Sequence, residues 1–208
     1  MSDFRTPQFR LSFPYITKQK KNKKTGDDAG YGISALIPKS DKVTPTFLKE
    51  LRAEVRAAIK AKFGEKAPEK LKKEFKENAG YPMRDGDDKG LFDTWRPEYE
   101  GCWVATLNAG KNQPGCLVRR LGAKALNAQE LEQEFYAGCN CIASVNVYAY
   151  DNESKGASIG LQNLIKMSDG EPLGGVRVAA ENDFDDLLEG GEDADDLEDS
   201  DYDEDDDL

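Results

Sequence analysis

Acidic residues are concentrated at the C-terminal end of this chain and limit how much of it can fold. Residues 181–208 contain 17 Asp or Glu and no Lys or Arg. A segment this densely charged repels itself and cannot bury enough apolar surface, so we expect a disordered acidic tail over 181–208. Residues 1–180 hold all 29 basic residues beside 23 acidic ones. The sequence pI of about 4.7 therefore describes the whole chain but not residues 1–180, the body of the protein, which carry a net positive charge.

Residues 1–180 are enough for one domain with a hydrophobic core and too few for two. No apolar run approaches the roughly 18 residues of a membrane span, and the N-terminus lacks the apolar stretch of an export signal. We therefore expect no membrane partner. Histidine is absent, which removes the commonest general base and the commonest nitrogen ligand for metals. Most hydrolase mechanisms are disfavoured as a result.

Alternating residues near the N-terminus predict a β-hairpin. Phe9, Leu11, Phe13 and Tyr15 share one side of a strand over 9–16, and a similar pattern predicts a second strand over 31–37. The loop between them holds clustered lysines with no acid among them, and such a tip is either merely solvated or binds phosphates. We favour phosphate binding because the charge density has little other use. These lysines are Lys18, Lys20, Lys21, Lys23 and Lys24.

The rest of the body predicts helices inserted into a small closed sheet. Thr44 is expected to cap a helix that ends near Gly64, and a second helix is expected from Pro68 to Gly80. Further strands and one short helix follow a long irregular stretch. The fold class is therefore mainly β with helical insertions (α+β) and about six strands. The later strands are expected over 102–108, 116–121, 141–150 and 159–167, and the short helix over 128–136.

The strand expected over 141–150 has two unlike faces. One face is small and apolar, and the other presents Tyr148 and Tyr150 among polar residues. Aromatic rings on a polar face are suited to stacking on nucleobases, which contributes roughly 1–3 kcal/mol per base. The alternative is that the two phenols only cover a sheet edge. Trp103, by contrast, alternates with apolar residues and is assigned to the core.

The irregular stretch 81–101 mixes aromatic and guanidinium side chains, the combination that stacks on bases and pairs with phosphates. The turn at 110–115 does not match a phosphate loop, but it could offer a lysine to a phosphate. The candidates from these two segments are Tyr81, Arg84, Trp95, Arg96 and Lys111.

The same stretch carries carboxylates that suggest an alternative function. Asp85, Asp87, Asp88 and Asp93 could hold Mg²⁺ in a nuclease, although simple Asp-Gly turns that shape the loop explain them better than a metal site does. Their spacing does not fit a calcium loop. The cysteines Cys102, Cys116, Cys139 and Cys141 lack the C-x₂-C spacing of zinc sites, so we expect buried, reduced thiols. No metal and no cofactor are expected.

Several motifs resemble a family of single-stranded DNA-binding proteins from tailed bacteriophages. They read YPMRDGD at 81–87, YAGC at 136–139, DGEPLGG at 169–175 and AENDFDD at 180–186. The resemblance covers most of residues 1–186. It implies an OB-fold, a five-stranded barrel, over 1–180. It also implies a non-enzymatic protein that coats unwound DNA during phage replication and recombination in the bacterial cytoplasm.

The resemblance also implies that single-stranded DNA is the main partner and that the acidic tail acts with it. The tail would compete with DNA for the body or recruit replication and recombination proteins. Tails of this kind often end in an aromatic residue, whereas this one ends in leucine, so electrostatic competition is the better supported role. The tail residues concerned are Asp203, Glu204, Asp205, Asp206, Asp207 and Leu208.

Two other functions stay open at this point. The first is the Mg²⁺-dependent nuclease that uses the carboxylates between Asp85 and Asp93. The second is an adaptor that mimics DNA through its tail and binds basic proteins instead of single strands; the lysine cluster argues against it. The oligomeric state and the choice between DNA and RNA do not follow from the sequence.

Overall fold

The computed structural model of the chain describes residues 4–22, 25–67, 82–152 and 155–174. The helix expected from Pro68, the candidates Lys23, Lys24 and Tyr81, and the acidic tail lie outside these residues. The expected domain boundary at residue 180 also lies beyond them and stays a prediction. No helix within the described ranges is long and apolar enough to cross a membrane.

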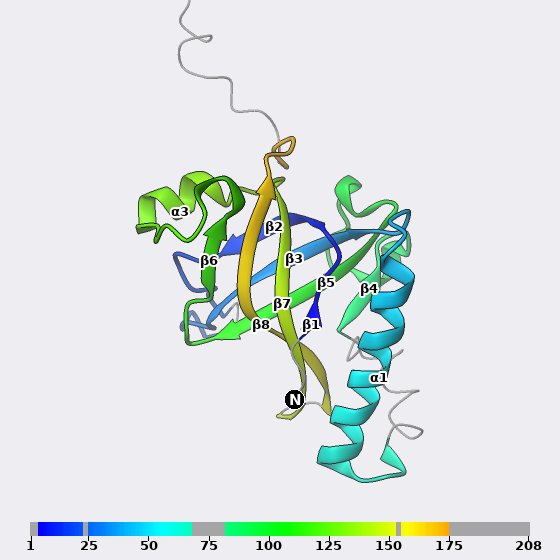
Figure 1. The fold of residues 1–208 in the computed structure, drawn as a ribbon. Helices are drawn as coiled ribbons and strands as arrows, with labels where there is room; N and C mark the ends of the chain where they lie inside the picture. Colours follow the sequence, from blue (N-terminus) through cyan, green and yellow to red (C-terminus); the bar gives the residue numbers. More distant parts are fainter. Residues whose placement is uncertain (1–3, 23–24, 68–81, 153–154, 175–208) are drawn as a thin grey trace, which may run out of the picture. The chain divides into compact units, whose positions relative to one another are not determined.

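Five strands form a barrel with the strand order of an OB-fold (Figure 1). β2 (Phe9–Tyr15) pairs with β3 (Tyr31–Pro38), β3 with β5 (Cys102–Gly110), β5 with β8 (Lys155–Ser168), β8 with β7 (Asn140–Asp151), and β7 with β2. Only the β5–β8 ladder among these five is parallel. This is the five-stranded Greek-key arrangement, so the expected mainly β fold and OB topology are confirmed.

The interior of the barrel is filled by every second residue of each strand. On β7, Ala143, Val145 and Val147 are buried, whereas the residues between them are partly exposed. Ile33 and Ile37 of β3 are buried in the same core. The two-residue period of a strand therefore separates core from surface as the alternation predicts.

The barrel is not closed evenly. β7 and β8 pair along their whole length, from Asn140 opposite Ser168 to Asp151 opposite Lys155, and form a long two-stranded ribbon. The other ladders of these two strands are short among the described residues. β5 meets β8 at Leu107–Ile159 and Asn108–Gly160, and β2 meets β7 at Phe9–Cys141 and Arg10–Asn140.

Three short strands extend the sheet beyond the barrel. β1 (Phe4–Arg5) pairs with β7, β4 (Met83–Asp85) with β5, and β6 (Gly115–Val118) with β8. The strand expected over 116–121 ends at Val118, where a 3₁₀ turn over Arg119–Leu121 begins. β1 and β4 were not expected, because two or three residues are too few to show alternation.

Helix α1 (Thr44–Phe63) lies between β3 and β4 in the chain and packs on the β7–β8 ribbon. Its buried stripe is Phe47, Leu51, Val55 and Ile59. The expected cap at Thr44 is wrong: Val43 precedes the helix, and the Thr44 hydroxyl donates to the Pro38 carbonyl at 2.9 Å. That bond ties the start of the helix to the end of β3.

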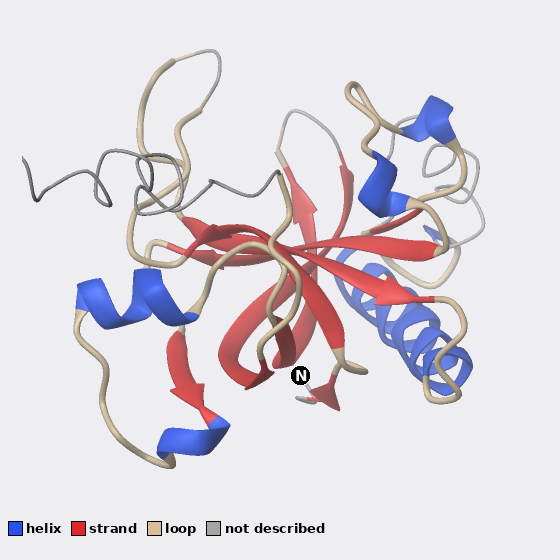
Figure 2. Ribbon diagram, turned by 90° about the horizontal axis from the view of Figure 1, so that it is seen from above, coloured by secondary structure: helices blue, strands red, loops and turns tan. Residues whose placement is uncertain are grey.

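The C-terminal end of α1 supports the far end of the ribbon. Lys62 Nζ donates to the Ala149 carbonyl at 3.1 Å, and Lys155 Nζ lies 5.5 Å from the centre of the Phe63 ring. Figure 2 shows α1 and the two 3₁₀ turns of residues 89–99 on one side of the strands and α3 on the other. Helix α1 thus covers the apolar side of the ribbon. The opposite side, which we call the open side, carries the partly exposed β7 residues Ser144, Asn146, Tyr148 and Tyr150.

Helix α3 (Ala128–Glu134) lies between β6 and β7 and begins with a capping box. The Asn127 side chain accepts from the Glu130 backbone N–H, and the Glu130 carboxylate accepts from the Asn127 N–H, both at 2.9 Å. Leu131 and Phe135 are buried in the barrel core. The helix expected over 128–136 is therefore confirmed, and a local capping signal explains its start.

The four cysteines are free thiols, as expected, but the expectation that all are buried is wrong for Cys102 and Cys116, which are partly exposed. Cys139 and Cys141 are buried with their sulfur atoms 3.7 Å apart. Burial raises the pKa of the Cys116 thiol to about 12, so this thiol stays protonated and unreactive at neutral pH. No cluster of three or more metal-ligating side chains occurs among the described residues.

A buried lysine holds the segment that follows β8. The side chain of Lys166 is 3% exposed, and its Nζ lies 2.8 Å from Glu134 Oε2 and 2.7 Å from Asp169 Oδ1. Arg120 also pairs with Glu134, and the Tyr136 hydroxyl donates to the Gly170 carbonyl at 2.9 Å. This network fixes the last described residues, up to Gly174, against the barrel.

Replacing Lys166 should destabilise the protein, because the Glu134 carboxylate, whose side chain is only 15% exposed, would lose its buried cation and keep Arg120 alone. We expect Lys166→Met to lower the free energy of unfolding by about 3 kcal/mol, measured by urea denaturation. Lys124→Met removes an exposed lysine from Glu130 and should cost less than about 1 kcal/mol. Equal losses in the two variants would show that the burial of Lys166 has no special importance.

The effect of Lys166→Met should disappear in acid. Hydrogen bonds from Lys166 lower the pKa of Glu134 and of Asp169 below their ordinary values. The stabilisation is thus present above the unfolded carboxyl pKa values and is lost as pH falls through the lower folded values. Burial alone would lower the pKa of Lys166, but its hydrogen bonds to Asp169 and Glu134 raise it, so the contribution persists through neutral pH.

Candidate nucleic-acid interface

The outer surface of β3 and β5 is where an OB barrel offers a groove to a linear ligand. In this fold the second and third strands, with the loops joining strands one to two and four to five, bind oligonucleotides and oligosaccharides. The corresponding parts here are β3, β5, the lysine-containing loop 16–30 and the β7–β8 turn. The following residues lie on or beside this surface.

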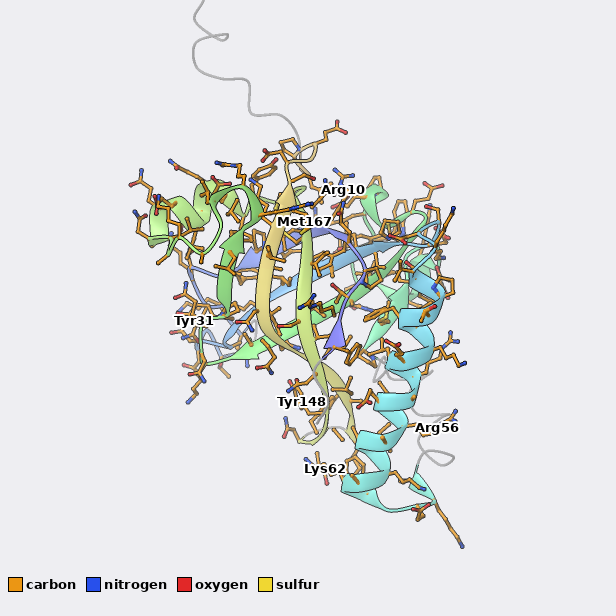
Figure 3. All side chains as sticks on the ribbon, in the orientation of Figure 1. Arg10, Tyr31, Arg56, Lys62, Tyr148 and Met167 are labelled. Carbon is orange, nitrogen blue, oxygen red and sulfur yellow. The ribbon has the colours of Figure 1, made fainter. Side chains whose placement is uncertain are left out.

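Two tyrosines lie on the open side of the β7–β8 ribbon. Tyr148 is opposite Ser158 and Tyr150 is opposite Gly156. A Cβ added at Gly156 would overlap the Tyr150 phenol, and one at Gly160 would overlap Asn146 Oδ1 and lie 3.5 Å from the Tyr148 ring. The glycines therefore leave room for the side chains of the neighbouring strand to lie across β8. Figure 3 labels Tyr148 on the part of the ribbon beside α1.

Lys20 reaches over the barrel strands from the loop 16–30. Its Nζ donates to Asn108 Oδ1 at 2.7 Å, and Asn108 Nδ2 donates to Ser158 Oγ at 3.1 Å. A Cβ at Gly32 would lie 2.8 Å from Lys20 Nζ. Burial lowers the pKa of Lys20 from its ordinary value. Lys20 and Tyr148 are therefore linked on one face through Asn108 and Ser158.

The other described lysines of this loop are exposed and meet acids. Lys21 Nζ lies 2.7 Å from Asp28 Oδ1, and Lys18 Nζ lies 3.5 Å from Glu132 Oε1. The expectation that this cluster faces no acids is therefore wrong for both. Asp28 lies in the same loop and pairs across the hairpin, so this contact was within reach of the local sequence; Glu132 comes from α3 and was not.

Lys111 lies in the exposed turn between β5 and β6. The same turn is tied to the start of the loop 16–30, because Gln113 Nε2 donates to the Ile16 carbonyl at 2.7 Å. Lys111 and the lysines of loop 16–30 therefore come from neighbouring loops at one end of β3 and β5. This placement is compatible with a shared phosphate-binding role.

The stretch 82–101 packs on the outer face at the other end of these strands. Leu36 of β3 and Val104 of β5 point outward and are buried under Tyr99, with Phe92 and Trp95 packed beside them. Trp95 Nε1 donates to the Gly86 carbonyl at 2.7 Å, and Lys89 Nζ lies 4.2 Å from the centre of the Trp95 ring. Trp95 is thus partly buried in a second, smaller core and has limited freedom to stack on a base.

The two arginines of this stretch have different surroundings. Arg84 donates to the Leu91 carbonyl at 3.2 Å and lies over the Phe92 ring at 4.8 Å, so it is engaged in holding the loop. Arg96 places its guanidinium carbon 5.0 Å from the centre of the Phe13 ring. Among these two candidates, Arg96 lies beside an exposed aromatic residue of the barrel.

Three of the four carboxylates of the nuclease alternative are held by protein groups. Lys39 Nζ pairs with Asp85 and, at 2.6 Å, with Asp87, and the Gly101 backbone N–H donates to Asp87 at 2.7 Å. The hydrogen bond from Lys39 lowers the pKa of Asp87. Asp88 accepts from the Gly90 N–H. These contacts shape the loop, and nothing in the arrangement supports a nuclease.

Phe13 and Tyr15 were expected on the same side of the strand as Phe9 and Leu11, and this was wrong. The register of β2 with β3 shifts between Ser12 and Tyr15, and Phe13 has a positive φ of 47°. Their side chains are consequently 36% and 39% exposed. Such a backbone costs about 1–3 kcal/mol for a bulky residue. Pro14 was the missed signal, because proline inside a strand often marks a bulge.

Sequence comparison links this barrel to phage proteins. The chain is 31% identical over 179 residues to protein p50 of Acyrthosiphon pisum secondary endosymbiont phage 1, a match that covers 86% of this chain and 90% of that protein. Residues 3–198 match the family described as "Enterobacter phage Enc34, ssDNA-binding protein".

Solved structures share the fold. The single-stranded DNA-binding protein from bacteriophage Enc34, solved in complex with ssDNA, superimposes with a TM-score of 0.65 at 22% identity, covering 83% of this chain and 89% of that one. The single-stranded DNA-binding protein encoded by bacteriophage T7 gives a TM-score of 0.51 at 13% identity, covering 86% and 99%. By its sequence match over 3–198, with the same barrel, the chain belongs to the Enc34 phage ssDNA-binding protein family.

Proposed function

We propose that this protein binds single-stranded DNA without sequence preference and without catalysis. It would coat unwound strands during phage replication and recombination in the host cytoplasm. Membership of the family supports this function, and so does the solved ssDNA complex of a protein with the same barrel.

The observation that carries the proposal is the one outer face to which Tyr148, Lys20 and Asn108 all contribute. Tyr148 offers an aromatic ring opposite Ser158 of the ribbon, and Lys20 offers a cation that is connected to Ser158 through Asn108. A ring can stack on any base, and a lysine can pair with any phosphate, so neither contact reads sequence.

The same arrangement favours a single strand over a duplex. Stacking on a protein ring requires the face of a base to be free, and in a duplex that face is covered by the neighbouring base pairs. Loop lysines at one end of β3 and β5 would follow the strand's phosphates. Lys18 and Lys21 are paired with carboxylates, so each would have to break an ion pair before it could bind a phosphate. We therefore expect these two lysines to add less to the affinity than Lys20 does.

Full-length protein should bind labelled oligo(dT) more tightly than a duplex of equal length. With four to six phosphates neutralised, the logarithm of the affinity should fall against the logarithm of salt concentration with a slope of about −3 to −4. Fluorescence anisotropy at several salt concentrations measures both quantities. Equal binding to both forms of DNA would contradict the proposal, and cleavage of the oligonucleotide in Mg²⁺ would revive the nuclease alternative.

Removing the ring of Tyr148 should weaken binding and leave the fold intact. We expect Tyr148→Ala to raise Kd for oligo(dT) about tenfold, within the roughly 1–3 kcal/mol range of base stacking. Tyr148→Phe keeps the ring and should bind as the wild type does. If Tyr148→Ala also bound normally at unchanged thermal stability, the ring would have only a covering role.

We further propose that the acidic tail weakens DNA binding by competing for the basic face. The last described residues support this, because they approach the outer surface of the barrel. Arg10 donates to the Glu171 carbonyl at 2.7 Å, and Leu173 packs beside Leu36, Tyr99 and Val104. The segment that leads into residues 175–208 therefore starts beside the strands of the proposed interface.

Removal of residues 181–208 should tighten binding to oligo(dT) several-fold at low salt. The difference should shrink as salt rises, because screening weakens attraction between the tail and the body. A full-length variant with every Asp and Glu of 201–207 changed to Asn or Gln is the control for chain length, and it should shift affinity in the same direction. Identical affinities with and without the tail would leave partner recruitment as its proposed role.

A further inference from the structure

Phe13 combines exposure with backbone strain. It is the one residue other than glycine with a positive φ among the described residues. Its side chain is 36% exposed, so core packing does not explain why a bulky aromatic residue occupies a conformation that suits glycine. Strained positions of this kind concentrate at ligand-binding sites.

The surrounding strand imposes the strain. Ser12 on one side is buried opposite Ser34, and Ile16 on the other side is buried in the core. The register shift between these anchors is what turns Phe13 and Tyr15 outward. The backbone distortion therefore has one evident result, which is to present two aromatic rings on the outside of β2.

A cation is already placed beside the Phe13 ring. The Arg96 guanidinium carbon lies 5.0 Å from the ring centre. Arg96 is itself positioned, because its carbonyl accepts from the Tyr99 N–H at 3.0 Å and Tyr99 is buried against Leu36 and Val104. An aromatic face with a guanidinium beside it matches a nucleotide, which offers a π-face and a phosphate.

The Phe13 site lies on the same side of the barrel as Lys20. Tyr15 is opposite Gly32, and Gly32 lies under the Lys20 amine. Gly32 is in turn opposite Asn108, the residue to which Lys20 donates. A row of groups thus crosses β2, β3 and β5, and it continues through Ser158 to Tyr148 on the ribbon.

We propose that Phe13, Tyr15 and Arg96 form a second nucleobase-stacking site, on β2, that engages the same single strand as Tyr148. This rests on the proposed function and adds a site at the opposite end of the row. The strand would pass over Lys20 between the two sites. A protein partner is the less suitable occupant, because Lys20 lies along the same row, whereas protein-docking surfaces are depleted of lysine.

Replacing Phe13 by glycine tests the proposal without damaging the fold. Phe13→Gly removes the ring and tolerates the positive φ, so its melting temperature should equal or exceed that of the wild type. Its Kd for an oligo(dT) of about 16 nucleotides, the upper end of the OB site-size range, should rise about tenfold. Leu117→Ala removes another exposed apolar side chain, from β6, and should leave Kd unchanged.

Oligonucleotide length separates the two sites. On the long oligonucleotide, Phe13→Gly and Tyr148→Ala should each weaken binding and should combine multiplicatively. On an oligo(dT) of about four nucleotides, the lower end of that range, the double variant should lose little more than the weaker-binding single variant, because so short a strand reaches one site at a time.

The outcomes distinguish this inference from the proposed function. Normal binding by Phe13→Gly, with weakened binding by Tyr148→Ala, would overturn the second site and leave the proposed function standing. No binding of single strands by the wild type would overturn the proposed function itself. If Phe13→Gly lowers the melting temperature, Phe13→Leu decides: it keeps apolar bulk and should still lose affinity. Normal affinity in Phe13→Leu, or altered self-association in sedimentation without altered binding, would overturn the second site.

Discussion

The absence of a side chain at Gly160 is the constraint on which both the barrel and its open face depend. This residue pairs in parallel with Asn108 of β5 and in antiparallel with Asn146 of β7, so it sits where the barrel closes. A Cβ there would overlap Asn146 Oδ1 and would lie in van der Waals contact with the Tyr148 ring, 3.5 Å from it. The barrel thus closes at a position where only glycine leaves room for Asn146, and a larger residue would displace Asn146 from the surface beside Tyr148 and disturb the short β5–β8 ladder.

The outer face is divided by a second, smaller core. At one end of β3 and β5, Leu36 and Val104 are covered by Tyr99 and its neighbours from the stretch 82–101. At the other end the outward positions are small or polar, Gly32 and Asn108 among them, and Lys20 lies over them. The apolar outward residues are thus covered by the stretch 82–101, whereas the small and polar outward residues remain free of that cover. This division positions Arg96 at the boundary between the two.

Sequence patterns correctly predicted the strands and helices whose formation depends on residues close together in the chain. The alternation over 141–150 correctly separated the buried residues from the face of Tyr148, and the hairpin around the lysines and the helix after Thr44 were found at nearly their observed bounds. Contacts between distant segments were missed. Glu132 meets Lys18, and Lys39 binds Asp85 and Asp87. The bulge at Phe13 reversed an alternation that looked regular, because one irregular backbone position moves every later side chain to the other face.

The strain at Phe13 links the stability of the barrel to its surface. A positive φ at a bulky residue persists only where the flanking structure is held firmly, and here Ser12 and Ile16 provide that anchorage. The buried residues of β2 therefore hold Phe13 in a backbone conformation that phenylalanine disfavours. What the protein gains is at the surface: the Phe13 ring is exposed beside Arg96, and Tyr15 is exposed opposite Gly32, over which Lys20 lies. A chain selected for stability alone would carry glycine or asparagine at this position. The aromatic residue is best explained by a ligand that meets its ring.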